Sequence, residues 1–204
     1  MLQSGIINNQ YSMILGSHNS WSYLPLTKWW MKPFAFMAKC QDYNIKQQYE
    51  LCGVRCFDLR IKFNKDGNLV IAHGNATYKY TRLDLEKDLY YLSNKGDCYV
   101  RVLHEIRNKK EHTDAAIEDF GNYCKYLEDT YRHIKFWCGR NLADWSMDYI
   151  FWHNPTCEEL YSSVCPPKLI DDWYPKLYAK LNNKKNLAKG TDKDIMLIDF
   201  VNIK

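Results

Sequence analysis

Two histidines stand where an apolar, strand-like segment gives way to a polar or glycine-containing turn. His18 follows Met13–Leu15, and His73 closes the segment Leu69–His73 just before Gly74. Because imidazole titrates near neutral pH, one histidine can accept a proton while the other donates one. The pair is a candidate for general acid–base catalysis. The alternative for each is a histidine that only caps its loop.

Asp58 and Arg60 lie two residues apart in the segment Gly53–Ile61, so in a strand their side chains point to the same face. Burying two ionised groups there is costly unless they are paired. A guanidinium also stabilises negative charge on phosphoryl oxygens. Together with the two histidines, this pair predicts cleavage of a phosphodiester. A plain interior ion pair is the alternative.

Two more acids belong to apolar segments. Glu105 ends Tyr99–Glu105, and Asp199 lies inside Ile195–Val201. A buried carboxylate needs a partner, and a histidine is suitable because the carboxylate fixes its tautomer and raises its basicity. We therefore expect a carboxylate–histidine pair in the site.

Apolar segments alternate with helical patterns along the chain, which favours an α/β fold with a parallel sheet. The predicted strands are Ser12–Leu15, Val54–Ile61, Leu69–Ala72, Tyr99–Leu103, Ile134–Cys138, Tyr149–Trp152 and Ile195–Val201. The predicted helices are Asp42–Leu51, Arg82–Ser93, Thr113–Tyr131 and Ile170–Leu181. Thr113 fits an N-cap, Pro175 must start or interrupt the last helix, and Asn64–Gly67 predicts a tight turn.

The composition indicates one globular domain over residues 1–204, with 46% hydrophobic and 25% charged residues. The net charge of +4 favours an anionic surface but does not indicate a nucleic-acid partner. No signal-peptide pattern or membrane span is evident, so we expect a cytoplasmic, phage or viral protein, or a processed secreted chain. A monomer is expected.

The eight cysteines show no zinc-binding spacing. Cys52 and Cys56 are separated by three residues, but no second pair with finger or ribbon spacing follows. Without a secretion signal, reduced cysteines that pack as small apolar residues are expected.

The order of the motifs resembles that of the phosphatidylinositol-specific phospholipase C (X-domain) superfamily of phosphodiesterases. The matching segments are Gly16–Ser20, Gly53–Arg60 and Ala72–Gly74, with Gln47–Gly53 resembling the helix before the second strand. The resemblance covers residues 12–107 and 195–202 and is almost absent from 108–194. It implies a compact, distorted TIM-like (β/α) barrel, abbreviated in its second half, with the site at the C-terminal strand ends.

The resemblance also implies a role for each candidate. His18 would be the general base that removes the proton of the inositol 2-hydroxyl, and His73 the general acid that protonates the leaving diacylglycerol oxygen. A cyclic phosphodiester would form and then be opened by water. Arg60 would stabilise the phosphoryl oxygens, with Asp58 as its neighbour, and Asp199 would pair with the base.

One position departs from the metal-independent bacterial members, which have Asp after the first histidine. Here it is Asn19, as in calcium-dependent relatives, and Glu105 also resembles a calcium-ligand position. Asn19, Asp58 and Glu105 could supply oxygen ligands to calcium. Because the charge of Arg60 would repel the ion, we expect catalysis without a cofactor, with calcium as the alternative.

An aromatic segment follows the first histidine. Trp29, Trp30, Phe34 and Phe36, with lysines between them, are typical of a membrane interface and are candidates for transient docking beside a phospholipid or inositol phosphodiester substrate. A buried core helix or lid is the alternative.

Four residues near other predicted strand ends could hold a sugar ring, although ordinary packing is favoured for each: Trp137, Arg140, Trp152 and His153. His104, His112 and His133 carry no functional prediction. Two other functions compete with the leading one. The first is a metal-dependent glycerophosphodiesterase or phospholipase D-like enzyme, and the second is a non-catalytic lipid- or inositol-phosphate-binding module.

Overall fold

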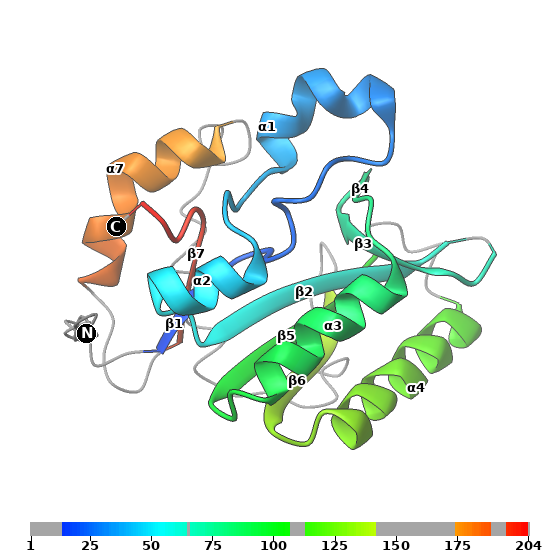
Figure 1. The fold of residues 1–204 in the computed structure, drawn as a ribbon. Coiled ribbons are helices and arrows are strands. Elements are labelled where there is room, and N and C mark those ends of the chain that lie inside the picture. Colours follow the sequence, from blue (N-terminus) through cyan, green and yellow to red (C-terminus); the bar gives the residue numbers. More distant parts are fainter. Residues whose placement is uncertain (1–13, 65, 107–112, 142–173, 189–194, 204) are drawn as a thin grey trace.

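The computed structural model describes residues 14–64, 66–106, 113–141, 174–188 and 195–203. Within them lie seven strands: β1 (Ile14–Ser17), β2 (Cys56–Phe63), β3 (Leu69–His73), β4 (Ala76–Thr77), β5 (Cys98–Glu105), β6 (Ile134–Asn141) and β7 (Ile195–Ile198). The helices are η1 (Trp29–Phe34), α1 (Ala35–Ala38), α2 (Ile45–Cys52), α3 (Arg82–Ser93), α4 (Asp114–Thr130) and α7 (Pro175–Leu187). Figure 1 shows their arrangement.

Five strands run parallel in the order β6–β5–β2–β1–β7. β2 pairs with β1 at its N-terminal end, through Cys56 and Phe57. Its C-terminal end, from Ile61 to Phe63, pairs with β3, and this pairing is antiparallel. Among the described residues no pairing joins β6 to β7, so this part of the sheet is open. The prediction of a parallel sheet is thus correct for five strands. It is wrong for β3, which returns through the turn predicted at Asn64–Gly67, where Gly67 has a φ of 74°.

Local sequence explains where the helices begin. Asn44 and Gln47 form a capping box at the start of α2, and Thr81 and Asp84 form another at α3. Thr113 caps α4 by accepting a hydrogen bond from a backbone N–H, as predicted. Pro175 occupies the first turn of α7, where its missing N–H costs nothing. The predicted start of this helix at residue 170 and the predicted strand 149–152 lie outside the described residues.

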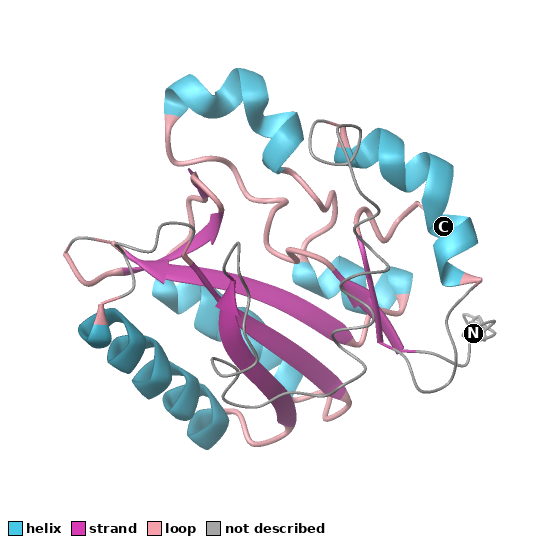
Figure 2. Ribbon diagram, turned by 180° about the vertical axis from the view of Figure 1, so that it is seen from behind, coloured by secondary structure: helices cyan, strands magenta, loops and turns pink. Residues whose placement is uncertain are grey.

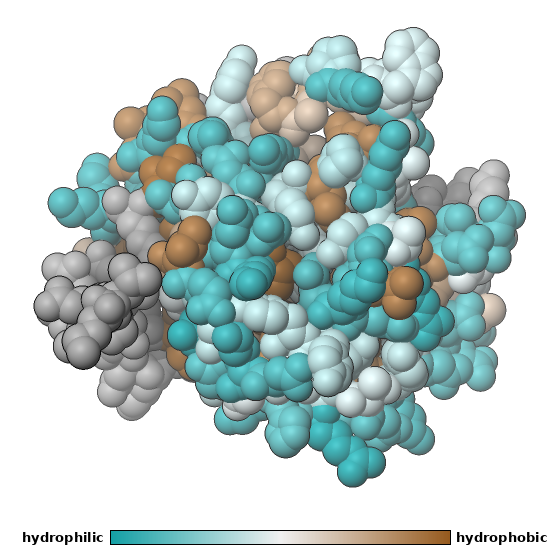
Figure 3. All heavy atoms as spheres, in the orientation of Figure 1, coloured by the Kyte–Doolittle hydropathy of each residue, from teal (hydrophilic) through white to brown (hydrophobic). Residues whose placement is uncertain are grey.

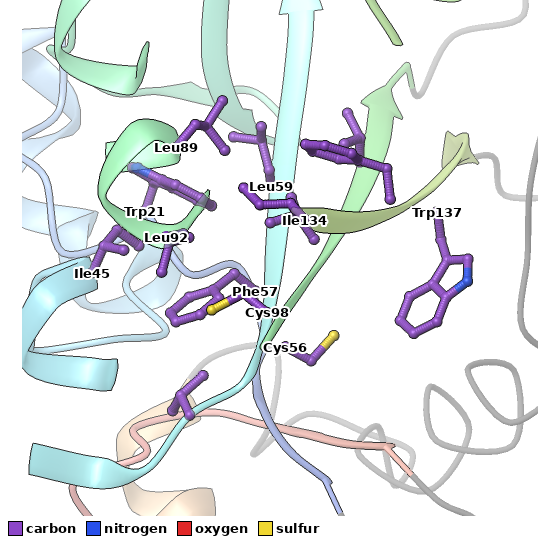
Figure 4. Packing of buried hydrophobic residues seen from close by; sticks show 14 of the residues in the cluster. Trp21, Ile45, Cys56, Phe57, Leu59, Leu89, Leu92, Cys98, Ile134 and Trp137 are labelled. Carbon is purple, nitrogen blue, oxygen red and sulfur yellow. The ribbon is translucent and has the colours of Figure 1, made fainter. Parts of the chain in front are cut away.

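Helices α2, α3 and α4 cover one face of the sheet, as Figures 1 and 2 show from opposite sides. Figure 4 shows Trp21, Ile45, Leu89 and Leu92 packed against β2, with Trp137 beyond the strands. Burying apolar side chains on this face provides the main driving force for folding. The opposite face carries the charged side chains of β2, which alternate with its apolar ones.

Gly16 allows β1 to lie tightly between its neighbours. A Cβ added there would overlap the side chain of Leu197 in β7 and lie 3.2 Å from the Cβ of Cys56 in β2. This close approach brings the ends of the three strands together, and these ends carry the predicted site. No helix in the described part of the chain is long and apolar enough to span a membrane.

Candidate active site

Three parallel strands deliver their polar residues to one point. His18 follows the last residue of β1, Asp199 follows β7, and Asp58 and Arg60 project from the middle of β2. Parallel strands present their C-terminal ends at the same edge of the sheet, so residues distant in sequence meet there. All four side chains are buried.

His18 lies between a carboxylate and a guanidinium. Its Nδ1 is 2.7 Å from Oδ1 of Asp199, and its Nε2 is 2.6 Å from an Nη of Arg60. Arginine can only donate, so Nε2 must accept, and Nδ1 therefore carries the proton that it donates to Asp199. The geometry thus selects the tautomer in which Nδ1 carries the proton and Nε2 is the accepting nitrogen. This is the expected carboxylate–histidine pair.

Arg60 connects the site to two further acids. Its Nε donates to Oδ2 of Asp58 at 2.9 Å, and an Nη lies 3.4 Å from Oε2 of Glu105. Burial alone would raise the pKa of Asp58, but electrostatic interactions, first with Arg60 and then with Arg101 and His18, outweigh it and lower the pKa to about 2. Asp58 therefore stays ionised and holds the guanidinium in place.

His73 reaches the same site from the end of β3. Its ring centroid is 6.0 Å from that of His18, and the two rings are nearly perpendicular. Its Nδ1 lies 3.3 Å from the carbonyl oxygen of Ala38. The residue is only partly buried, and its ring lies edge-to-face beside that of His18, so two groups able to transfer protons stand side by side.

Asn19 and Glu105, the metal-position candidates, also lie at the site. The backbone N–H of Asn19 donates to Oδ2 of Asp58, and that of Gly74 donates to Oε1 of Glu105. Among the described residues, Asn19 Oδ1 and Asp58 Oδ1 are buried without a hydrogen-bond partner. These oxygens fit a hard cation, but the guanidinium of Arg60, bonded to Asp58 and near Glu105, fits it poorly.

Sequence reasoning missed a residue that organises the backbone of the site. The side-chain amide of Gln41 donates to the carbonyl oxygens of His18 and Ile198 and accepts from the N–H of Val201. It therefore ties the end of β1 to the turn after β7. Gln41 lies in an irregular loop, and no sequence pattern distinguishes such a buried glutamine from a surface one.

The aromatic segment lies exposed near the site. Trp29 is 77% exposed, and Trp30, Phe34 and Phe36 are each about half exposed or more. On the surface around η1 and α1, residues of apolar and intermediate hydropathy lie among hydrophilic ones (Figure 3). The exposure argues against the alternative of a buried core helix.

The remaining sugar-binding candidates gain nothing from the structure. Trp137 is buried and stacks on Tyr99 with a centroid distance of 5.0 Å, as ordinary packing would have it. The side chain of Arg140, together with Trp152 and His153, lies outside what the structure describes. His104, for which no function was predicted, stacks on Phe120 under α4.

Comparison with known proteins gives matches in structure only. No family model and no curated protein matches the chain. The phosphatidylinositol-specific phospholipase C of Listeria monocytogenes superposes with a TM-score of 0.62 at 16% identity, covering 92% of this chain and 87% of that one. A point variant of the Staphylococcus aureus enzyme gives 0.59 at 15% identity, covering 94% and 86%. The fold is thus shared over most of both chains. This agrees with the predicted fold, a distorted (β/α) barrel that is abbreviated in its second half.

Proposed function

We propose that this chain, which has the fold of the bacterial phosphatidylinositol-specific phospholipases C, is a phosphodiesterase of that superfamily. One observation carries the proposal. His18, whose Nδ1 bonds Asp199 and whose Nε2 bonds Arg60, lies next to His73, with the two ring centroids 6.0 Å apart. Two proton-transferring groups and a guanidinium are what cleavage of a phosphodiester requires.

In the proposed mechanism, His18 removes a proton from a substrate hydroxyl through Nε2. The hydroxyl oxygen attacks phosphorus while His73 protonates the leaving oxygen, and a cyclic phosphodiester forms. Water then opens the ring with the two roles exchanged. The proton accepted by His18 makes it a cation, which Asp199 at 2.7 Å stabilises.

Arg60 would change partners when substrate binds. In the structure, one Nη donates to Nε2 of His18. A phosphoryl oxygen is a stronger acceptor for guanidinium, so it would draw this donor away and leave Nε2 open to the substrate hydroxyl. Asp58 would keep Arg60 in place throughout by its bond to Nε. Substrate binding would thereby activate the base.

We further propose that Arg60 replaces a metal ion in this site. Its charge lies between Asp58 and Glu105, where a cation would bind these carboxylates. The unpartnered oxygens of Asn19 and Asp58 support calcium as the alternative. A fixed cation in this position makes a second positive charge between Asp58 and Glu105 unfavourable.

The substrate proposed is a phosphatidylinositol or a related phosphodiester at a membrane surface. The exposed Trp29, Trp30, Phe34 and Phe36 would enter the interface and Lys28 and Lys32 would contact anionic headgroups. Lys28 lies over the ring of Trp30 with its Nζ 5.4 Å from the ring centroid, so charge and aromatic surface are presented together.

The function is tested with a fluorogenic inositol phosphodiester and with phosphatidylinositol vesicles, each assayed in calcium and in chelator. We expect turnover that chelator does not reduce. Glycerol and choline phosphodiesters serve as comparison substrates and test the glycerophosphodiesterase alternative. Activity that chelator abolishes would show that Arg60 does not replace a metal. No turnover of any substrate, with inositol phosphate still bound, would indicate the non-catalytic binding module.

A further inference from the structure

Cys40 lies inside the candidate site, although the proposed reaction gives it no role. It follows α1 and is 2% exposed. Its Sγ lies 3.9 Å from the side-chain nitrogen of Asn19. One ligand atom each from His18, Cys40 and Asp199 lie within 4.8 Å of one another, and all three residues are buried. An imidazole, a thiol and a carboxylate therefore face a common point.

The backbone holds these three residues in a fixed arrangement. The N–H of Phe200 donates to the carbonyl oxygen of Cys40 at 2.6 Å, which joins the cysteine to the residue after Asp199. The side chain of Gln41, next to Cys40, bonds the carbonyl oxygen of His18. Asn183 of α7 adds a bond to the carbonyl oxygen of Asp199. These hydrogen bonds hold the three residues, so their candidate ligand atoms lie close together because of the fold.

We propose that His18, Cys40 and Asp199 form a binding site for a zinc-like transition-metal ion and that the bound ion inhibits the enzyme. Zinc prefers combinations of thiolate, imidazole and carboxylate ligands, whereas calcium and magnesium prefer oxygen. Three protein ligands leave a fourth position for water. The bond between His18 and Asp199 must open for the ion to enter, since the ion takes the place of the shared proton.

The protons can be followed through binding. Burial, with a contribution from the nearby Asp199, raises the pKa of the Cys40 thiol, so its proton passes to solvent as the metal–sulfur bond forms. The ion occupies Nδ1 of His18, and the ring proton moves to Nε2. An N–H then faces Arg60, which can only donate, so the guanidinium must turn away. The base loses its acceptor, and Arg60 loses its bond to His18 while keeping the bond to Asp58.

Binding is tested on the full chain with Co²⁺, which reports a thiolate ligand through a charge-transfer absorption band in the near ultraviolet. We expect one equivalent to give this band in the parent protein. Cys98→Ser, a matched change at another buried cysteine, should keep the band. Cys40→Ser and Cys40→Ala should lose it while melting at temperatures near the parent's. An unchanged band in both folded Cys40 variants, or no band in the parent, would overturn the site.

Inhibition rests on the proposed function and is measured separately. Each variant is assayed in Zn²⁺ relative to its own metal-free rate. We expect the concentration for half-inhibition to rise at least tenfold in Cys40→Ser and to stay unchanged in Cys98→Ser. Equal inhibition of both would contradict the inhibitory role. If no variant has activity, the proposed function fails, and the Co²⁺ band still decides whether the metal site exists.

Discussion

Two regions of the molecule have side chains in opposite environments: the cluster formed by His18, Asp58, Arg60 and Asp199, and the aromatic segment that follows His18 in sequence. His18 and Arg60 are almost fully buried, and each contacts partners from other strands. Trp29 and Phe34, large apolar residues that normally enter the core, face solvent instead. Polar residues are therefore inside and aromatic residues outside, the reverse of the usual distribution.

This reversal fits the two tasks of the proposed function, catalysis and docking to a membrane surface. Chemistry requires charges whose positions are fixed before substrate arrives, so the cluster accepts the cost of burial and meets it with paired ions. Docking to a lipid surface requires apolar area that remains free until the membrane provides a partner. Each region departs from what folding alone favours, and each departure can be tested separately.

The largest effect is expected from the two histidines. His18→Ala and His73→Ala should each lower turnover by roughly two to four orders of magnitude, because each removes a proton-transfer group. The measurement is kcat on the soluble inositol phosphodiester. His104→Ala is the matched control, since that buried histidine packs under α4 away from the cluster. A change below threefold for either site histidine would remove it from the proposed mechanism.

An intermediate effect is expected from acid on the ion pairs of the cluster. Asp58 has a pKa lowered to about 2, so its contribution to stability is complete above its unfolded value of 3.8 and is lost as pH falls towards 2. This shift corresponds to on the order of 2 kcal/mol. The free energy of unfolding of the parent should therefore fall more steeply than that of Asp58→Asn between these pH values. Parallel curves would show that Asp58 is not held as an ion by Arg60.

Changes in the aromatic segment are expected to have the smallest effect on turnover of the soluble substrate. Their main effect should be on binding to lipid vesicles. Trp29→Ala/Trp30→Ala should weaken binding to phosphatidylinositol vesicles by about tenfold or more, because two apolar side chains no longer enter the interface. Turnover of the soluble substrate should stay within twofold. Tyr90→Ala, which removes an exposed aromatic residue from α3, is the control. If the parent, the double tryptophan variant and Tyr90→Ala bind vesicles equally, the exposed tryptophans do not dock the protein to the membrane.

Sequence patterns predicted the strands that carry the site because their evidence is local. The alternation around Asp58 and Arg60 places both side chains on one face, and the structure shows them bonded to each other. The cap at Thr113 and the turn before Gly67 are also local features. The alternation of strands and helices favoured a parallel sheet and did not indicate that β3 is antiparallel, whereas the tight turn predicted at Asn64–Gly67 is the local signal that joins antiparallel strands.

The sequence by itself determined which chemical groups are present and, through strand periodicity, which of them share a face. Tertiary structure alone decided that His18 meets Asp199, 181 positions away, that Arg60 donates to its Nε2, and that Gln41 and Cys40 join them. The physical reason is that parallel strands bring their ends to one edge only after the sheet has formed. The tautomer of His18, on which the proposed base depends, is a property of that assembly.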